Sequence, residues 1–351
     1  MRAMTLDRVQ PAMRLGKTLY AGDGRILLHR GTALSEEDLE HLRTLGFSAL
    51  YIEDETPIEA KEPVSDKTRQ IAVAAVKEAF STLKPNHGRK TNADWSGRRV
   101  LYQAAGSIVA EVSASKDLCI QMMEMRSADG YAFQHAVNVC ILGMALAQKL
   151  QMSHNKLVDL AIGLLIHDIG KQLLPEKLRE DRMLAPEEKK EYMAHCEGGY
   201  GLLRDLGSTF GAPSRIVALQ HHERWDGNGY PRGLRGDQIH EFAQICAIAN
   251  TYDRLTTSNA YGKRALPHEA LEYLMGACGT HFSLPMVQAF LEVVAPYPVG
   301  TKVKLNTGET GLVSRIEPKL PQRPVLWLIE TQAEYALADH PDRAIVGVVE
   351  D

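Results

Sequence analysis

Histidine and aspartate recur at the ends of apolar segments in the middle of this 351-residue sequence. The members are His135 in YAFQHAVNV, His167 and Asp168 in LLIHDIGK, His195 in YMAHCEGG, and His221 and His222 at the start of HHERWDGNGYP. A buried imidazole or carboxylate without a partner costs about 2–7 kcal/mol of desolvation or more. We therefore expect these side chains to share a partner.

A metal ion is the simplest partner that such a set can share. Neutral imidazole and carboxylate together suit Zn, Fe, Mn or Ni, and sites of this kind are built between the facing helices of a bundle. A single one of these histidines would more often be structural. An HD dipeptide that closes an apolar helix, together with a later HH pair, favours metal binding over core packing.

The segments that carry these residues have the pattern of helices. Apolar residues recur at spacings of three and four over residues 100–112, 135–150, 155–166, 214–222, 241–255 and 268–277. Residues 157–166 are apolar nearly all round, which is typical of a helix inside a bundle. We expect a helical domain over about residues 98–295.

Shorter units are predicted on either side of this domain. Residues 1–54 have the pattern of a small α+β module, in which Ser35 and Asp38 can form a capping box. Residues 55–97 are interpreted as a linker and a connecting helix. Residues 296–351 alternate with a period of two and are predicted to form a small β unit. The expected fold class is mainly α, a helical bundle between these two units.

Composition limits the classes of function. The chain is 44% hydrophobic and 24% charged with a net charge of −4, which argues against a binder of duplex nucleic acid. The apolar run 157–166 is much shorter than the roughly 20 residues of a membrane span. Scattered cysteines without a CxxC motif are interpreted as reduced, packed thiols, and a cytoplasmic location is expected; these are Cys119, Cys140, Cys196, Cys246 and Cys278.

The same residues resemble a known family. HDIGK, the histidine of AHCEGG and the run HHERWDGNGYPRGL closely match the HD-GYP domain, the HD-superfamily phosphodiesterases of bacterial cyclic di-GMP signalling. The resemblance implies a helical bundle with two divalent ions and a bridging hydroxide that hydrolyses cyclic di-GMP to pGpG or GMP. It favours Fe or Mn as the metal, with Zn or Ni as alternatives.

The resemblance also implies a role for each matching residue. Asp168 is expected to bridge the two ions, with His135 and His167 on one ion, and the other ion held by His195, His221 and His222. Tyr131 stands where trinuclear members have a Glu, which favours a binuclear site. Lys171 follows Asp168 by one turn and is expected to neutralise charge on the phosphate, so that both residues are assigned to catalysis.

A loop of Gly229, Tyr230 and Pro231 gives the family part of its name. Gly227 and Gly229 permit close backbone approach, and Pro231 stiffens the exit. Tyr230 is expected to contact the cyclic dinucleotide or to serve a partner such as a GGDEF-type cyclase. The sequence leaves a homodimer open.

Three positions depart from the family pattern. Asn250 stands where a metal-binding Asp is expected, Asn259 replaces a substrate-binding Arg, and Gln244 replaces another Arg. An amide oxygen can still coordinate, but weakly and without charge. Asp253 on the same predicted helix could compensate in part, as could Lys263 and Arg264 for the lost arginine.

These departures keep three functions open. The first is hydrolysis of cyclic di-GMP. The second is a weakly active or noncatalytic module that binds cyclic di-GMP or docks a GGDEF-type partner. The third is hydrolysis of a different phosphate ester, such as another cyclic dinucleotide.

Overall fold

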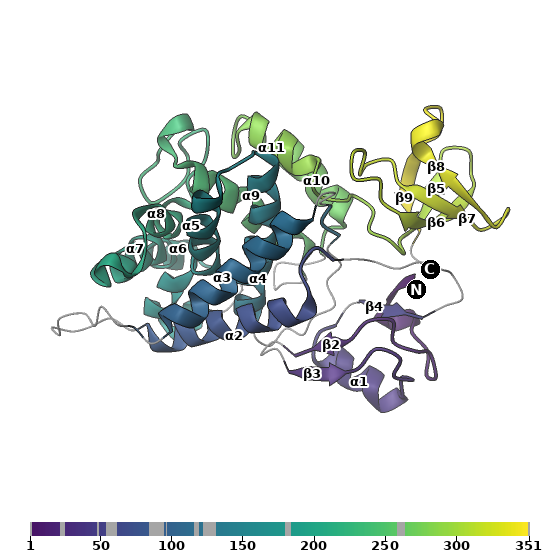
Figure 1. Cartoon of the computed structure of the whole chain (residues 1–351), viewed down its shortest axis with the longest axis horizontal. Helices are drawn as coiled ribbons and strands as arrows, with labels where there is room; N and C mark the ends of the chain where they lie inside the picture. Colours follow the sequence, from purple (N-terminus) through teal and green to yellow (C-terminus); the bar gives the residue numbers. More distant parts are fainter. Residues whose placement is uncertain are drawn as a thin grey trace.

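A helical domain lies between two smaller modules in the computed structural model of the chain (Figure 1). The structure describes residues 2–21, 25–47, 49–53, 62–83, 95, 97–115, 119–121, 131–179, 184–257 and 264–349. The N-terminal module and the C-terminal sheet both lie on the right of the helical domain in Figure 1. This arrangement confirms the predicted fold class.

The helical domain is built around one continuous apolar core. Its helices are α2 (Asp66–Thr82), α3 (Arg98–Ala114), α4 (Tyr131–Lys149), α5 (His154–Leu165), α6 (Pro186–Met193), α7 (His195–Asp205), α8 (Ala212–Gln220), α9 (Glu241–Thr256), α10 (Pro267–Gly276) and α11 (Leu284–Leu291). Proline stands in the first turn of α6, α8, α10 and α11, where its missing N–H costs no helical hydrogen bond. The core of α4, α5 and α9 is almost wholly apolar, so the few polar groups there are conspicuous.

Helix α2 differs from its predicted role as a connecting helix. Its apolar face, which includes Ala72, Val76 and Phe80, is buried in the same core as α3 and α4. On this evidence the helical domain begins before residue 97. The predicted domain boundaries at 54, 97 and 295 otherwise stay predictions.

The terminal modules are small sheets. In the N-terminal module β1 (Arg2–Thr5) pairs with β4 (Ala49–Ile52), and β2 (Leu19–Tyr20) pairs with β3 (Ile26–Leu28), both antiparallel. Helix α1 (Glu36–Thr44) packs there and begins with the predicted capping box of Ser35 and Asp38. The turn predicted at 22–24 lies outside the described residues.

The C-terminal module is one antiparallel sheet with the strand order β8-β7-β6-β5-β9. Its strands are β5 (Lys302–Leu305), β6 (Thr310–Arg315), β7 (Val325–Leu328), β8 (Ala333–Ala336) and β9 (Ile345–Val348). The hairpin between β5 and β6 turns at Gly308, whose φ of +94° is open to glycine without strain.

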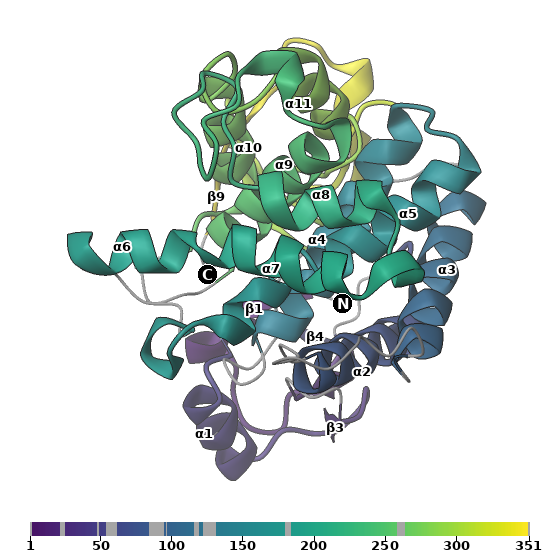
Figure 2. The ribbon, with the colours of Figure 1, turned by 90° about the vertical axis from the view of Figure 1, so that its left-hand side faces the viewer.

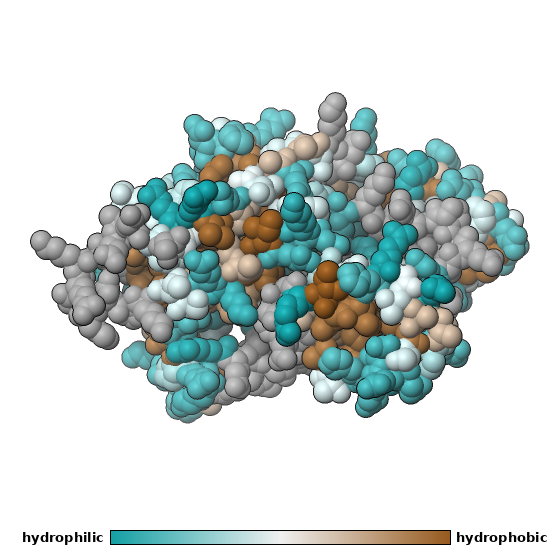
Figure 3. Space-filling view, turned by 60° about the horizontal axis from the view of Figure 1, so that its bottom comes forward, coloured by the Kyte–Doolittle hydropathy of each residue, from teal (hydrophilic) through white to brown (hydrophobic). Residues whose placement is uncertain are grey.

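The surface is a mixture of polar and apolar side chains. Seen from below the view of Figure 1, apolar side chains gather in a few patches among polar ones (Figure 3). Large apolar side chains with substantial exposure include Ile26 on β3 and Ile71 on α2. Among the described segments, no helix combines the length and the apolar character that crossing a bilayer requires.

Candidate metal centre

Four packed helices bring the predicted ligands together. Helices α4, α7, α8 and α9 lie side by side (Figure 2), and the short helix η2 (Ile169–Leu173) packs against α7. His135, His195 and the pair His221 and His222 stand near the ends of α4, α7 and α8. His167 and Asp168 lie between α5 and η2, and Asn250 lies within α9. All are buried except His222, which is half-buried.

Asp168 lies at the centre of the cluster, with two imidazoles near each of its carboxylate oxygens. Oδ2 is 3.3 Å from His167 Nε2 and 4.0 Å from His135 Nε2. Oδ1 is 3.5 Å from His221 Nε2 and 3.6 Å from His195 Nε2. His167 and His135 thus lie near one oxygen and His221 and His195 near the other, and the assignment of these residues as metal ligands stays a prediction.

The other ring nitrogen of each imidazole holds the ring in place. Nδ1–H donates to a backbone carbonyl three or four residues earlier in three cases: His167 to Leu164 at 2.8 Å, His195 to Tyr192 at 2.7 Å and His221 to Val217 at 3.0 Å. His135 Nδ1 instead donates to Asp253 Oδ2 at 2.7 Å. These bonds set the tautomer and direct the lone pair of each Nε2 toward Asp168.

Several atoms that face the centre are suited to a cation. His167 Nε2, Asp168 Oδ1 and His222 Nε2 are buried and make no hydrogen bond within the described part of the chain, and the same holds for Asn250 Oδ1 on α9. Buried polar atoms are nearly always satisfied in native proteins. Lone pairs on imidazole, carboxylate and amide together form a donor set for a divalent transition metal, so these residues fit the expected group.

The protonation states also suit metal binding. Burial lowers the pKa of His195 to about 3 and lowers the pKa values of His221 and His222, so these rings are neutral at pH 7. Burial opposes ionisation of Asp168, but the positive charge of Lys171 and the neighbouring imidazoles of His167 and His221 together outweigh it and hold the pKa of Asp168 well below its usual value. Lys171 Nζ donates to Asp168 Oδ2 at 2.7 Å. Burial alone would lower the pKa of Lys171, but Asp168 raises it overall.

Gly170 permits the close approach of η2 and α7. A Cβ at this position would lie 1.9 Å from the carbonyl oxygen of His195 and 2.6 Å from the amide nitrogen of Gly199. The glycine of HDIGK therefore brings the first residue of α7 against Asp168. This packing is a physical reason for glycine in the motif.

The loop that follows the HH pair is held rigidly beside the centre. Both oxygens of the buried Glu223 accept backbone hydrogen bonds, from Arg232 N at 2.8 Å and Leu234 N at 2.9 Å. A Cβ on Gly229 would lie 2.3 Å from Arg224 N, so only glycine fits. Tyr230, which precedes Pro231, stacks on His222 with ring centroids 4.7 Å apart.

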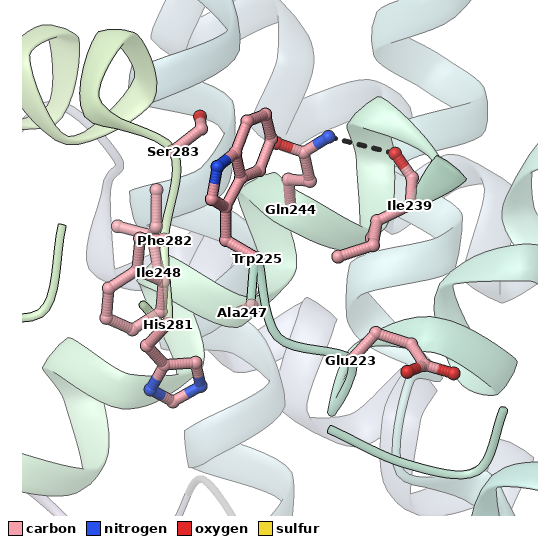
Figure 4. Close-up of a pocket in the computed structure, with 9 residues that line it drawn as sticks. All are labelled: Glu223, Trp225, Ile239, Gln244, Ala247, Ile248, His281, Phe282 and Ser283. Carbon is pink, nitrogen blue, oxygen red and sulfur yellow. Dashed lines mark hydrogen bonds between the residues drawn. The ribbon is translucent and has the colours of Figure 1, made fainter. Parts of the chain in front are cut away.

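A small pocket lies behind this loop (Figure 4). Trp225 and Gln244 face each other in it, and Glu223 and His281 lie at its lower edge in this view. Gln244 Nε2 donates to the carbonyl oxygen of Ile239 at 2.9 Å. Gln244, which stands in the place of an Arg of the family pattern, thus bonds to the backbone in this pocket.

The structure places the remaining predicted residues unequally. Asn250 is buried on α9, and its Oδ1 accepts no hydrogen bond from the described residues. Asp253 does not join the donor set, because its oxygens bond to His135 and to Asn138 Nδ2 at 2.7 Å. Arg264 is half-buried before α10. Asn259 and Lys263 lie outside the described residues.

Two residues near the centre were missed in the sequence. Cys196, interpreted as a packing cysteine, has its Sγ 3.5 Å from His195 Nε2. Arg254 on α9 is close enough for its charge to act on two side chains of the site. It lowers the pKa of His222, as burial does, and it partly offsets the rise that burial causes in the pKa of Tyr230. Its position four residues after Asn250, on the same helix face, was the available signal.

The fold and the cluster together define a helical domain with histidine and aspartate side chains that could hold a metal ion. Residues 117–283 match the HD domain family. The chain is 33% identical over 214 residues to the cyclic di-GMP phosphodiesterase PA4108 of Pseudomonas aeruginosa, covering 60% of this chain and 51% of that protein. It is 31% identical to a cyclic di-GMP phosphodiesterase of Thermotoga maritima, covering 46% of this chain and 44% of that protein.

A solved structure has a similar fold. The protein Bd1817 of Bdellovibrio bacteriovorus, described as an HDG"Y"P protein, is similar with a TM-score of 0.52 and 21% identity, covering 83% of this chain and 98% of that one. The match to the HD domain family covers a little under half of this chain, and the likeness to Bd1817 shows a similar fold. The chain spans about half the length of the curated relatives.

Proposed function

We propose that this chain is a metal-dependent phosphodiesterase that hydrolyses cyclic di-GMP to pGpG or GMP with two divalent ions. The convergence of buried imidazoles on both oxygens of Asp168 carries the proposal. PA4108 and the Thermotoga maritima relative are both named cyclic di-GMP phosphodiesterases, which supports cyclic di-GMP as the substrate. The family resemblance favours Fe or Mn, with Zn or Ni as alternatives, and the imidazole ligands suit Fe, Zn and Ni.

The chain supplies the groups that such a reaction needs. When bound, the ions supply Lewis acidity, which acidifies a water and neutralises charge on a phosphodiester. Lys171 keeps Asp168 ionised and offers its ammonium group to a phosphate oxygen. Arg254 offers a second cation from α9, with a planar guanidinium that matches a phosphate. Tyr230, stacked on His222, presents an aromatic surface to a guanine base.

A weakly active or noncatalytic module is the second candidate, because Asn250 offers an amide where a carboxylate was expected. We expect Asn250→Asp to raise both the metal content and the rate of hydrolysis if the amide weakens the site. An unchanged metal content and rate would show that residue 250 is not a ligand. In a noncatalytic module, the loop of Gly229, Tyr230 and Pro231 would serve a GGDEF-type partner.

A substrate panel tests the proposal. Purified protein loaded anaerobically with Mn or Fe is incubated with cyclic di-GMP, a mixed GMP–AMP cyclic dinucleotide and a linear dinucleotide. We expect the first to give pGpG or GMP fastest. No linear product with either metal would overturn catalysis, and calorimetric binding of cyclic di-GMP would then support the noncatalytic module. Faster cleavage of one of the other two compounds would identify that compound, rather than cyclic di-GMP, as the preferred substrate.

A further inference from the structure

The second ligand group contains a thiol besides its three imidazoles. Cys196 follows His195 at the start of α7 and is fully buried. Its Sγ and one nitrogen each of His195, His221 and His222 all lie within 4.8 Å of one another. We propose that the thiolate of Cys196 is a further ligand of the ion held by these histidines, an inference that rests on the metal binding in the proposed function.

The spacing of the donor atoms fits one ion. A sulfur about 2.3 Å and an imidazole nitrogen about 2.0–2.1 Å from the same zinc are separated by about 3.1 Å at an angle of about 90° and by about 3.8 Å at about 120°, the angles of a five-coordinate ion. Cys196 Sγ lies 3.5 Å from His195 Nε2, and His195 Nε2 lies 3.5 Å from His221 Nε2. The donor atoms therefore have the separations of ligands that share an ion.

Other cysteines in the chain have a different environment. The thiol of Cys140 donates to the carbonyl oxygen of Ala161 at 3.6 Å, and that of Cys278 to Leu274 at 3.5 Å. These are the contacts of thiols that pack in a helical core. The contact of Cys196 is with the nitrogen lone pair of a predicted ligand, because His195 Nδ1–H donates to Tyr192.

A thiolate would also change the charge and the selectivity of the centre. Two groups of potential metal ligands lie in the described part of the chain: His135, His167 and Asp168, and His195, Cys196, His221 and His222. Asp168 is the only carboxylate in these two groups. A second anionic ligand balances one more positive charge of two divalent ions. Because thiolate is soft, it favours Zn or Fe over Mn at this position. We therefore expect the two ions to sit in unlike environments, one with sulfur and one with nitrogen and oxygen only.

X-ray absorption of zinc-loaded protein tests the inference without an activity assay. The whole chain, the Cys196→Ser variant and the Cys140→Ser variant are loaded anaerobically. We expect a sulfur scatterer at about 2.3 Å from zinc in the unmodified chain, at about half a sulfur per zinc when two ions are bound. It should be lost in Cys196→Ser and retained in Cys140→Ser, which matches it in burial.

Cobalt gives a second readout in case Cys196→Ser folds poorly. Cobalt-loaded unmodified chain should show a thiolate-to-metal charge-transfer band in the near ultraviolet, and Cys140→Ser should keep it. A fully loaded chain without this band and without a sulfur scatterer would overturn the inference. A sulfur signal that persists in Cys196→Ser would do the same.

Failure of the inference and failure of the proposed function give different results. A chain that binds zinc through nitrogen and oxygen alone contradicts the role of Cys196 but leaves hydrolysis intact. A chain that binds neither zinc nor cobalt contradicts both. A sulfur-ligated ion in a chain that cleaves no cyclic dinucleotide supports the inference and contradicts the enzyme.

Discussion

At the scale of single residues, the centre depends on which ring nitrogen each histidine turns toward Asp168. Three imidazoles are oriented by backbone carbonyls three or four residues earlier in the chain. His135 is oriented by Asp253, which Asn138 holds from the other side. A carboxylate behind a ligating imidazole fixes its orientation and raises its basicity. Asp253 is therefore a positioning residue rather than the replacement ligand that the sequence suggested.

Neutralising Asp253 should weaken the metal site. We expect Asp253→Asn to lower metal affinity about 10- to 100-fold, because His135 loses its anionic acceptor. Competition with a chelator measures this affinity. Asp205→Asn, at an exposed position near the end of α7, is the control and should bind metal normally. Equal affinity in both variants would contradict this role of Asp253.

The ligand types could be predicted from the sequence, whereas their supporting residues could not. HD and HH are chemically distinctive where they interrupt apolar helices. Asp253, Arg254 and Cys196 lie in ordinary helical patterns, and their roles depend on distances between helices. Such distances come from packing, which a single sequence does not display.

At the scale of elements, the close packing of η2 against α7 determines where His195 lies. Gly170 and Gly199 meet at this contact, and a side chain at Gly170 would overlap the backbone of α7. The six predicted helical segments are all present, because long runs with a helical period are a strong signal. The packing role of α2 was not visible, because its alanine-rich apolar face resembles that of any amphipathic helix.

A methyl group on Gly170 should force α7 away from Asp168. We expect Gly170→Ala to lower the free energy of unfolding by about 1–3 kcal/mol and to reduce the metal content. Urea unfolding and elemental analysis measure the two effects. Gly201→Ala on α7 is the matched control, because a Cβ there meets no atom within 4 Å. If the two variants behave alike, the close contact does not matter.

Helix α9 carries Asn250, Asp253 and Arg254 within little more than one turn. If Arg254 binds a substrate phosphate, Arg254→Gln should raise KM about tenfold or more while metal content stays unchanged. The exposed Arg204→Gln on α7 is the control for loss of one positive charge. A metal content that falls with Arg254→Gln would indicate a structural role.

At the scale of the whole molecule, a chain of polar contacts joins the N-terminal module to the metal centre. Lys17 Nζ lies 2.7 Å from Glu62 Oε1, and Glu62 Oε2 lies 3.2 Å from Arg69 Nε on α2. Arg69 Nη1 donates to Asn138 Oδ1 at 3.2 Å, and Asn138 donates to Asp253. The module is thus connected to a ligand's supporting carboxylate through residues that are far apart in the sequence.

Acid should destabilise the metal-free chain. The pKa of His195 is lowered to about 3 by burial, whereas an unfolded histidine has a pKa of about 6.5. Between these values the unfolded state binds more protons, so the free energy of unfolding falls as pH falls from about 6.5 toward 3. The lowered pKa of Asp168 acts in the same direction.

Urea unfolding of metal-free protein at pH 7 and pH 5 measures the effect. We expect a lower midpoint at pH 5 and a smaller difference in His195→Gln, which cannot be protonated. Identical midpoints at the two pH values would contradict neutral, buried imidazoles at the centre.

Metal stoichiometry tests the central claim most directly. Elemental analysis of anaerobically purified protein should find two divalent ions per chain. Asp168→Asn should bind far less metal while keeping the helical circular dichroism of the unmodified chain. A folded, unmodified chain that holds no transition metal after exposure to Fe, Mn and Zn would contradict a metal centre at Asp168.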